Sequence, residues 1–171
     1  MRCFCMPHVD IYFKKAESNV ENIVEACSGR YVHVEMIPSD HEFMYTSYMF
    51  ETFTQNNIIA HDPHIYTLLR ISLSEEEHSG TVDMLLRLTD RSIPYNYSDL
   101  PWCVVPSITA LKDIKNEEEI TALFCSQAII LVLRLNVESS RDIYQALMDL
   151  NSRTTSPTML FEKLKQYGEI I

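Results

Sequence analysis

A cysteine in front of an apolar run carries the most chemical information in the sequence. Cys125 is followed by Ser126 and then by the apolar residues 128–133, a pattern typical of a buried helix that begins close to the cysteine. A thiol in the first turn of a helix lies at the positive end of the helix dipole, which favours the thiolate over the thiol. Together with a histidine from another element, such a cysteine would form a nucleophile and its general base.

His33 is the candidate partner of Cys125. Residues 31–37 alternate in a way that predicts a strand with His33 and Glu35 on the same face. Beside Cys125, His33 would act as general base toward the thiol and then as general acid toward the leaving group. A second interpretation stays open, in which a core cysteine and a sheet histidine have no catalytic role. A helix that begins as early as Glu117 would favour it, because Cys125 would then lie in mid-helix.

Local patterns predict an α+β fold, with an antiparallel β-sheet packed against helices, in one domain of residues 1–171. Capping boxes at Ser18 and Ser74 predict two helix starts, and Gly29 suits the left-handed end of the first helix. Residues 92–106 contain three prolines and are expected to form a loop. Strands are expected over residues 9–13, 31–37, 42–53 and 65–73. Helices are expected over residues 18–27, from 74, over 117–135, over 139–150 and from 156, and a break of the 117–135 run just before Cys125 stays open.

Charge and cysteine content narrow the classes of function. The 171 residues carry a formal net charge of -10, and they hold no Lys/Arg cluster that would bind nucleic-acid phosphates. The five cysteines are odd in number and are not spaced as in a disulfide-rich scaffold. The longest apolar run, residues 128–133, is far too short to span a membrane, and the first residues do not resemble a signal peptide. We therefore expect an intracellular protein of a reducing compartment, with no nucleic-acid partner and no transmembrane segment.

Two further clusters contain metal-ligating residue types at spacings that suit a metal poorly. Cys3, Cys5 and His8 lack a second pair at zinc-finger spacing. His61 and His64 flank an Asp-Pro pair, which is typical of a turn. We expect neither a metal nor a cofactor.

Five short motifs occur in order along nearly the whole chain. They are Val32-His33-Val34-Glu35-Met36, Tyr45-Thr46-Ser47, Pro94-Tyr95-Asn96-Tyr97, Phe124-Cys125-Ser126-Gln127 and Ser156-Pro157-Thr158-Met159-Leu160. With these motifs the chain resembles the circularly permuted papain-like enzymes of the NlpC type, including their YiiX-like and lecithin retinol acyltransferase-like relatives. In that permutation the strand with the histidine precedes the helix with the cysteine.

The resemblance implies a cysteine-dependent hydrolase or acyltransferase of the thiol peptidase, amidase or lipid-ester hydrolase kind. Cys125 would be the nucleophile and His33 its base, and a peptide, lipid or small acyl or amide substrate would pass through a thioester acyl-enzyme. The third catalytic position aligns with Thr46 and Ser47. The expected contacts to substrate are Glu35, Tyr95, Tyr97 and Gln127.

Two positions depart from the family pattern. Val32 replaces the serine before the histidine, and Gln127 replaces the glutamate after Cys-Ser. An alternative function therefore stays open: a non-catalytic structural or interaction module on the same fold. Because relatives of this kind occur in large DNA viruses, such a module could be a virion component. The eight methionines would suit adaptable contact surfaces.

Overall fold

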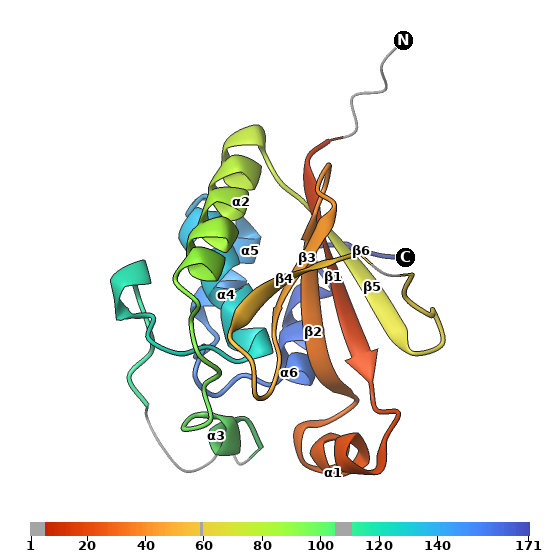
Figure 1. Ribbon diagram of the computed structural model, residues 1–171. Coiled ribbons are helices and arrows are strands. Elements are labelled where there is room, and N and C mark those ends of the chain that lie inside the picture. Colours follow the sequence, from red (N-terminus) through yellow and green to blue (C-terminus); the bar gives the residue numbers. More distant parts are fainter. Residues whose placement is uncertain (1–5, 59, 105–110) are drawn as a thin grey trace.

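A six-stranded antiparallel sheet forms one layer of the molecule and helices form the other (Figure 1). The computed structural model describes residues 6–58, 60–104 and 111–171. The strand order in the sheet is β4-β3-β2-β1-β5-β6. The predicted α+β class with an antiparallel sheet is confirmed. The strands are β1 (His8–Lys15), β2 (Tyr31–Pro38), β3 (Phe43–Ser47), β4 (Phe53–Asn57), β5 (Tyr66–Ser72) and β6 (Glu169–Ile170).

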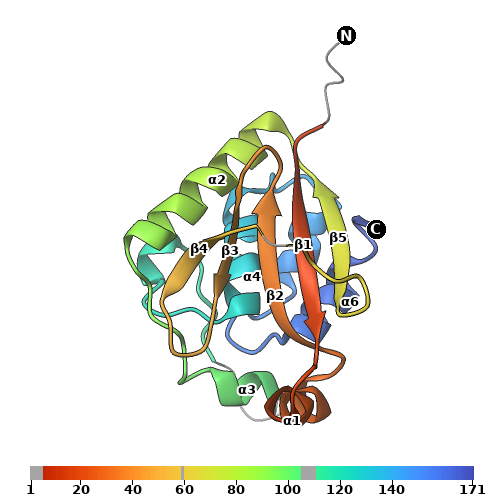
Figure 2. The ribbon, with the colours of Figure 1, turned by 45° about the vertical axis from the view of Figure 1, so that its right-hand side comes forward.

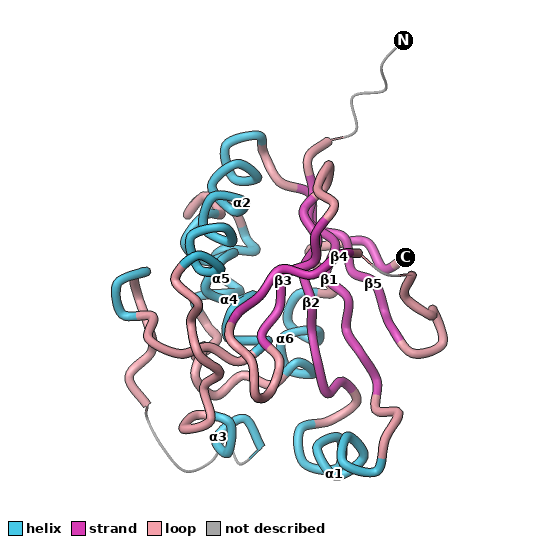
Figure 3. Tube along the Cα trace, viewed as in Figure 1, coloured by secondary structure: helices cyan, strands magenta, loops and turns pink. Residues whose placement is uncertain are grey.

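Most of the helices gather on one face of the sheet, and Figure 2 shows them behind the central strands. Helix α4 packs against β2, and α2, α5 and α6 pack around α4. The short helices α1 and α3 lie close to each other at one end of the sheet, as Figure 3 also shows. The bounds are α1 (Asn19–Ser28), α2 (Glu75–Asp90), α3 (Leu100–Val104), α4 (Cys125–Asn136), α5 (Asp142–Met148) and α6 (Pro157–Leu164), with a 3₁₀ turn η1 (Glu117–Glu119) before α4.

Side-chain alternation in β1 divides the sheet into a core face and an open face. Val9, Ile11 and Phe13 are fully buried against the helices, so Tyr12 and Lys14 point the other way. Across the antiparallel pair, Tyr12 lies opposite Glu35 of β2 and Lys14 lies opposite His33. The polar residues of β2 therefore lie on the open face, beside Tyr12 and Lys14.

Helix α4 is the centre of the core. Every residue from 125 to 134 is buried, which fits a helix that is apolar on nearly all sides. Fully buried side chains of α2, α6 and the sheet surround it, among them Leu85, Leu160 and Met36. The position of the start of α4 is therefore set by the packing of the whole domain.

Three helices begin where their capping residues predict. Ser18 and Ser74 each accept a hydrogen bond from the third residue of their helix, and both capping boxes are complete. Gly29 ends α1 with φ 91°, in the region that favours glycine. Ser156 caps α6, whose first residue is Pro157.

Three predicted elements are corrected by the structure. Within the strand expected over 42–53, the structure has β3 and only the first residue of β4, because the chain turns at Phe50 with a positive φ of 72°. Of the helical run expected over 117–135, the structure has the turn η1 and then α4, so the run is broken before Cys125, which is the alternative that the sequence left open. The described part of the loop expected over 92–106, which excludes residues 105–106, contains the short helix α3. The sequence pattern did not predict the strand β6.

Candidate active site

Cys125 is the first residue of α4, and its surroundings hold that position in place. Phe124 precedes it in an extended conformation, and its backbone N–H donates to Gln127 Oε1. The Ser126 hydroxyl donates to the carbonyl oxygen of Thr155 at 2.7 Å, which ties the helix start to the segment before α6. Cys125 is 6% exposed. The alternative that places Cys125 in mid-helix is thereby excluded.

His33 is held on β2 by Thr46 and by an aromatic ring. Its Nε2 lies 3.1 Å from Thr46 Oγ1, and the Thr46 hydroxyl donates to the carbonyl oxygen of Val34 at 3.0 Å. Because that hydroxyl hydrogen is used, the Thr46 oxygen accepts a hydrogen bond from Nε2–H of His33. The Tyr48 ring stacks on the imidazole with centroids 4.7 Å apart. These contacts assign the tautomer with hydrogen on Nε2, which leaves Nδ1 of a neutral imidazole free to accept a proton.

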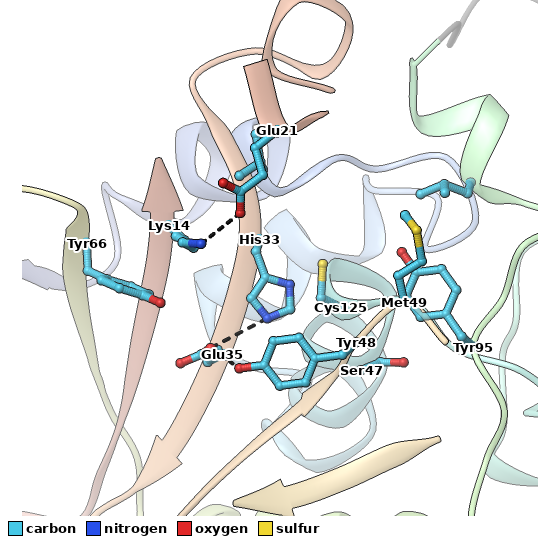
Figure 4. A pocket seen from close by; sticks show the side chains of 12 residues that line it. Lys14, Glu21, His33, Glu35, Ser47, Tyr48, Met49, Tyr66, Tyr95 and Cys125 are labelled. Atoms are coloured by element: carbon cyan, nitrogen blue, oxygen red, sulfur yellow. Dashed lines mark hydrogen bonds and ion pairs between the residues drawn. The ribbon is translucent and has the colours of Figure 1, made fainter. Parts of the chain in front are cut away.

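The thiol of Cys125 lies beside His33, close enough to act on the imidazole. Figure 4 shows the imidazole between the sulfur on one side and the Glu35 carboxylate on the other. Since Nε2 is directed to Thr46 and Glu35, the nitrogen available to the thiol is Nδ1. The two residues are therefore arranged as a nucleophile and its base.

Glu35 lies at the centre of a buried polar cluster. Its Oε1 accepts the Tyr48 hydroxyl at 2.6 Å and lies 3.6 Å from His33 Nε2, and its Oε2 lies 2.8 Å from His61 Nε2. The residue is 1% exposed. A buried carboxylate needs partners of this kind, because burial without them would strongly disfavour the charge.

The partners of each group decide its protonation. Burial works against the charged imidazole of His33, but the neighbouring Cys125 and the Glu35 carboxylate outweigh it and raise the pKa of His33 to about 9. Burial likewise works against the Glu35 carboxylate, yet its hydrogen bonds with His33, His61 and Tyr48 hold its pKa well below the usual range. Burial and the neighbouring Glu35 charge raise the pKa of Tyr48, so its hydroxyl remains a donor. The cluster therefore keeps His33 protonated beside the Glu35 carboxylate at neutral pH.

A cavity of about 390 Å³ opens over Cys125 and His33 (Figure 4). Its walls are mostly apolar or aromatic, with an ion pair between Lys14 and Glu21, 2.7 Å apart, on the side of β1 and α1. The residues that line it are Lys14, Glu21, Val32, His33, Glu35, Ser47, Tyr48, Met49, Tyr66, Tyr95, Leu100 and Cys125.

Only some of the predicted site residues line the cavity. Those that do are Cys125, His33, Glu35, Ser47 and Tyr95. Thr46 contacts His33 from within the protein, as an orienting residue would. Ser47 donates to the carbonyl oxygen of Leu123 at 2.8 Å, so its hydroxyl fixes the backbone before α4 rather than His33.

Two expected substrate contacts do not lie on the cavity wall. Gln127 is fully buried, and its Oε1 accepts hydrogen bonds from Phe124 and from the side chain of Asn96. Its amide thus has a structural role in capping α4. Tyr97 is 47% exposed, and its hydroxyl accepts the backbone N–H of Phe50 at 2.6 Å. Its hydroxyl holds the turn between β3 and β4, outside the cavity.

The sequence reasoning missed Tyr48, His61 and the Lys14–Glu21 pair. Tyr48 follows Ser47 directly, beyond the end of β3, where alternation no longer predicts a direction. Lys14 could have been found from an antiparallel pairing of β1 with β2, which sets it opposite His33. His61 carries no local signal, since it reaches Glu35 from the connection between β4 and β5.

Comparison of the chain with protein-family models, with curated proteins and with solved structures finds no match. Over residues 6–58, 60–104 and 111–171, no three His, Cys, Asp or Glu side chains are grouped as metal ligands would be. No helix in those same ranges combines the length and apolar character needed to cross a membrane. The predicted weak cluster at Cys3 and Cys5 lies outside the described residues.

Proposed function

We propose that this protein is a cysteine-dependent hydrolase or acyltransferase that works through a thioester acyl-enzyme. One observation carries the proposal: Cys125 and His33 lie side by side in the wall of one cavity, and the far side of the imidazole faces Thr46 and Glu35. Acyl transfer to a thiol requires a nucleophile, its base and a group that orients the base. The resemblance to permuted papain-like enzymes of the NlpC type supports the same class of reaction.

The first half of the reaction forms the acyl-enzyme. With the proton on Nδ1 of His33, the sulfur of Cys125 attacks the carbonyl carbon of the substrate as a thiolate, so that a C–S bond forms and the carbonyl electrons move to oxygen. The backbone N–H of Cys125 has no acceptor within α4, because it belongs to the first turn, and it is available to bind this oxyanion. The C–N or C–O bond then breaks, and the Nδ1 proton goes to the leaving group.

The second half returns the enzyme to its starting state. A water molecule, or an alcohol or amine acceptor, attacks the thioester carbonyl and gives its proton to Nδ1 of His33. The C–S bond breaks and the sulfur of Cys125 leaves with the electron pair. Water as the acceptor gives hydrolysis, and any other acceptor gives acyl transfer. The mostly apolar cavity wall suits the apolar part of a peptide, lipid or small amide substrate.

Selective alkylation tests the activated thiol. Iodoacetamide near neutral pH should label Cys125 about 10-fold faster than it labels Cys125 in His33→Ala, because an ordinary thiol is only a few per cent ionised at that pH. Peptide mass spectrometry separates Cys125 from the other four of the five cysteines. His64→Ala is the matched control, since His64 is exposed, and it should leave the rate unchanged.

Acylation tests the covalent step itself. With p-nitrophenyl butyrate, the intact mass should rise by one butyryl group on Cys125, and neutral hydroxylamine should remove it. Cys125→Ser should accumulate no such thioester. If Cys125 in the wild type reacts as slowly as in His33→Ala and takes up no acyl group, the enzyme proposal is wrong. The alternative of a non-catalytic structural or interaction module would then be favoured.

A further inference from the structure

His61 is a buried titratable residue that the reaction above does not use. Its side chain is 4% exposed, although the residue comes from the connection between β4 and β5. Its Nε2 lies 2.8 Å from Glu35 Oε2. Ordering a connecting segment and burying an imidazole both cost free energy. The position of this side chain therefore calls for a specific explanation.

Two aromatic rings hold His61 in its orientation. The imidazole stacks on Tyr12 of β1, with centroids 4.1 Å apart and an interplanar angle of 21°, and it meets Tyr66 of β5 edge-on at 4.4 Å. Tyr12 is also the cross-strand neighbour of Glu35. The ring that supports His61 is thus beside the carboxylate that His61 binds. This arrangement fixes both the plane of the imidazole and the direction of its Nε2.

We propose that His61 is a positioning residue for the reaction at Cys125, acting through Glu35 and then His33. The terminal torsion of a glutamate is broad, so a carboxylate held by one oxygen only can turn. His61 holds Oε2, and thereby keeps Oε1 directed to His33 Nε2 at 3.6 Å. Tyr48 donates to the same Oε1 at 2.6 Å and limits its movement from the other side.

This role rests on the proposed function and gives His61 no contact with the reacting atoms. Its consequence is electrostatic as well as geometric. Hydrogen bonds to a carboxylate favour the charged form, so His61 helps to keep Glu35 ionised at mildly acidic pH, where an imidazolium at His33 needs a counter-charge. Without His61, Glu35 would take up a proton at a higher pH, and His33 would lose this partner.

Two substitutions separate the hydrogen bond from the packing. His61→Phe keeps an aromatic ring on Tyr12 but removes the donor to Glu35, whereas His61→Gln keeps a side-chain N–H at a similar reach and loses the ring. The readouts are the rate of Cys125 alkylation by iodoacetamide as a function of pH, the pKa of His33 from NMR, and the thermal midpoint. His61→Phe should slow alkylation near neutral pH by about 10-fold, because small misplacements of a catalytic group have effects of this size or larger.

The pH profile distinguishes positioning from a merely structural role. In His61→Phe, the acid side of the alkylation profile should move up by about one pH unit, because a Glu35 carboxylate that can turn away from His33 supports the imidazolium less. His61→Gln should stay close to the wild type in rate and profile. The inference is wrong if His61→Phe lowers only the thermal midpoint, or if His61→Gln is as slow as His61→Phe. Should His61→Phe not fold, His61→Asn, whose shorter amide does not reach Oε2, takes its place with the same expectations. A wild type whose Cys125 reacts no faster than in His33→Ala refutes the proposed function itself, before any His61 variant is compared.

Discussion

Glu35→Gln should lower the pKa of His33 by about 1 to 3, because an opposite charge within about 4–6 Å moves a pKa by this amount. Glu35 Oε1 lies 3.6 Å from His33 Nε2, and both side chains are largely buried, at 2% and 14% exposed. Glutamine preserves the shape and can still accept the hydrogen bond from Tyr48 through its amide oxygen. The substitution therefore removes the charge while changing the packing little.

The size of the effect follows from the protonation of His33. Burial opposes the imidazolium, and Cys125 and Glu35 together raise the pKa of His33 from the ordinary 6.5 to about 9. That difference corresponds to about 3 kcal/mol in favour of the protonated imidazole in the folded state. This stabilisation is fully present below pH 6.5 and is lost as the pH rises through about 9, since the folded state then gives up the extra proton. Because Cys125 is the larger raising cause, Cys125→Ala should lower the pKa further than Glu35→Gln does.

NMR of labelled histidine gives the measurement. The chain has six histidines, and the imidazole signal of His33 is assigned by its loss in His33→Asn. Glu42→Gln is the matched control, because Glu42 is an exposed carboxylate and its loss should leave the signal unchanged. A wild-type pKa near 6.5 would refute the charged pair. A pKa in Glu35→Gln within about 0.3 of the wild type would show that Glu35 does not act on His33 electrostatically, since an opposite charge within about 4–6 Å shifts a pKa by about 1 to 3.

Two further substitutions test Thr46 and the turn at Phe50. Thr46→Val should lower the free energy of unfolding by about 1–2 kcal/mol through the loss of two hydrogen bonds, and it should slow Cys125 alkylation. Thr46→Ser keeps the hydroxyl and should leave the alkylation rate near that of the wild type. Equal alkylation rates in the Val variant and the wild type would contradict the orienting role of Thr46. Phe50→Gly should raise the free energy of unfolding in urea by about 0.5–1 kcal/mol. A left-handed conformation costs a residue with a Cβ about 1–2 kcal/mol, and glycine removes this strain. The greater conformational entropy of glycine in the unfolded chain offsets only part of that gain. Phe50 has φ 72° and is 85% exposed, and Glu51→Gly, at a position without positive φ, should be destabilising instead.

Local signals in the sequence were sufficient to predict where α1 and α2 begin and to predict β2. Contacts between residues distant in the sequence decide where α4 begins. The acidic run at residues 117–119 favours a helix, yet that helix stops after one turn. The chain between η1 and α4 is extended because Leu123 exchanges backbone hydrogen bonds with Pro94 and Asn96. Such pairing competes with helix formation, and no pattern within residues 117–125 reveals it. This extension is what places Cys125 at a helix N-terminus.

In the site, too, local motifs identify some residues, whereas contacts between distant segments determine the others. Cys125 and His33 were identified from residue type, spacing and the order of motifs. Glu35 was predicted as a substrate contact, although the structure places its carboxylate beside the imidazole. Its partners come from beyond the end of β3 and from the connection before β5, so only the folded chain assembles them. Positions that depend on three separate segments cannot be derived from the periodicity of any one of them.

The polar cluster around Glu35 bears on the choice between an enzyme and a structural module. Burying a carboxylate costs free energy that its partners only offset, and well-packed apolar side chains often stabilise a fold equally well or better. The core between the sheet and α4 does not depend on this cluster, because it is formed by the opposite face of β1 and β2. The cluster instead contacts His33, which lies beside the buried thiol at the start of α4. Fold stability alone gives no reason for a cluster in which Glu35 contacts His33 and His33 lies beside Cys125, so this arrangement supports chemistry at the sulfur. Substitution of His33 or Glu35 should therefore change the alkylation rate of Cys125 far more than the free energy of unfolding.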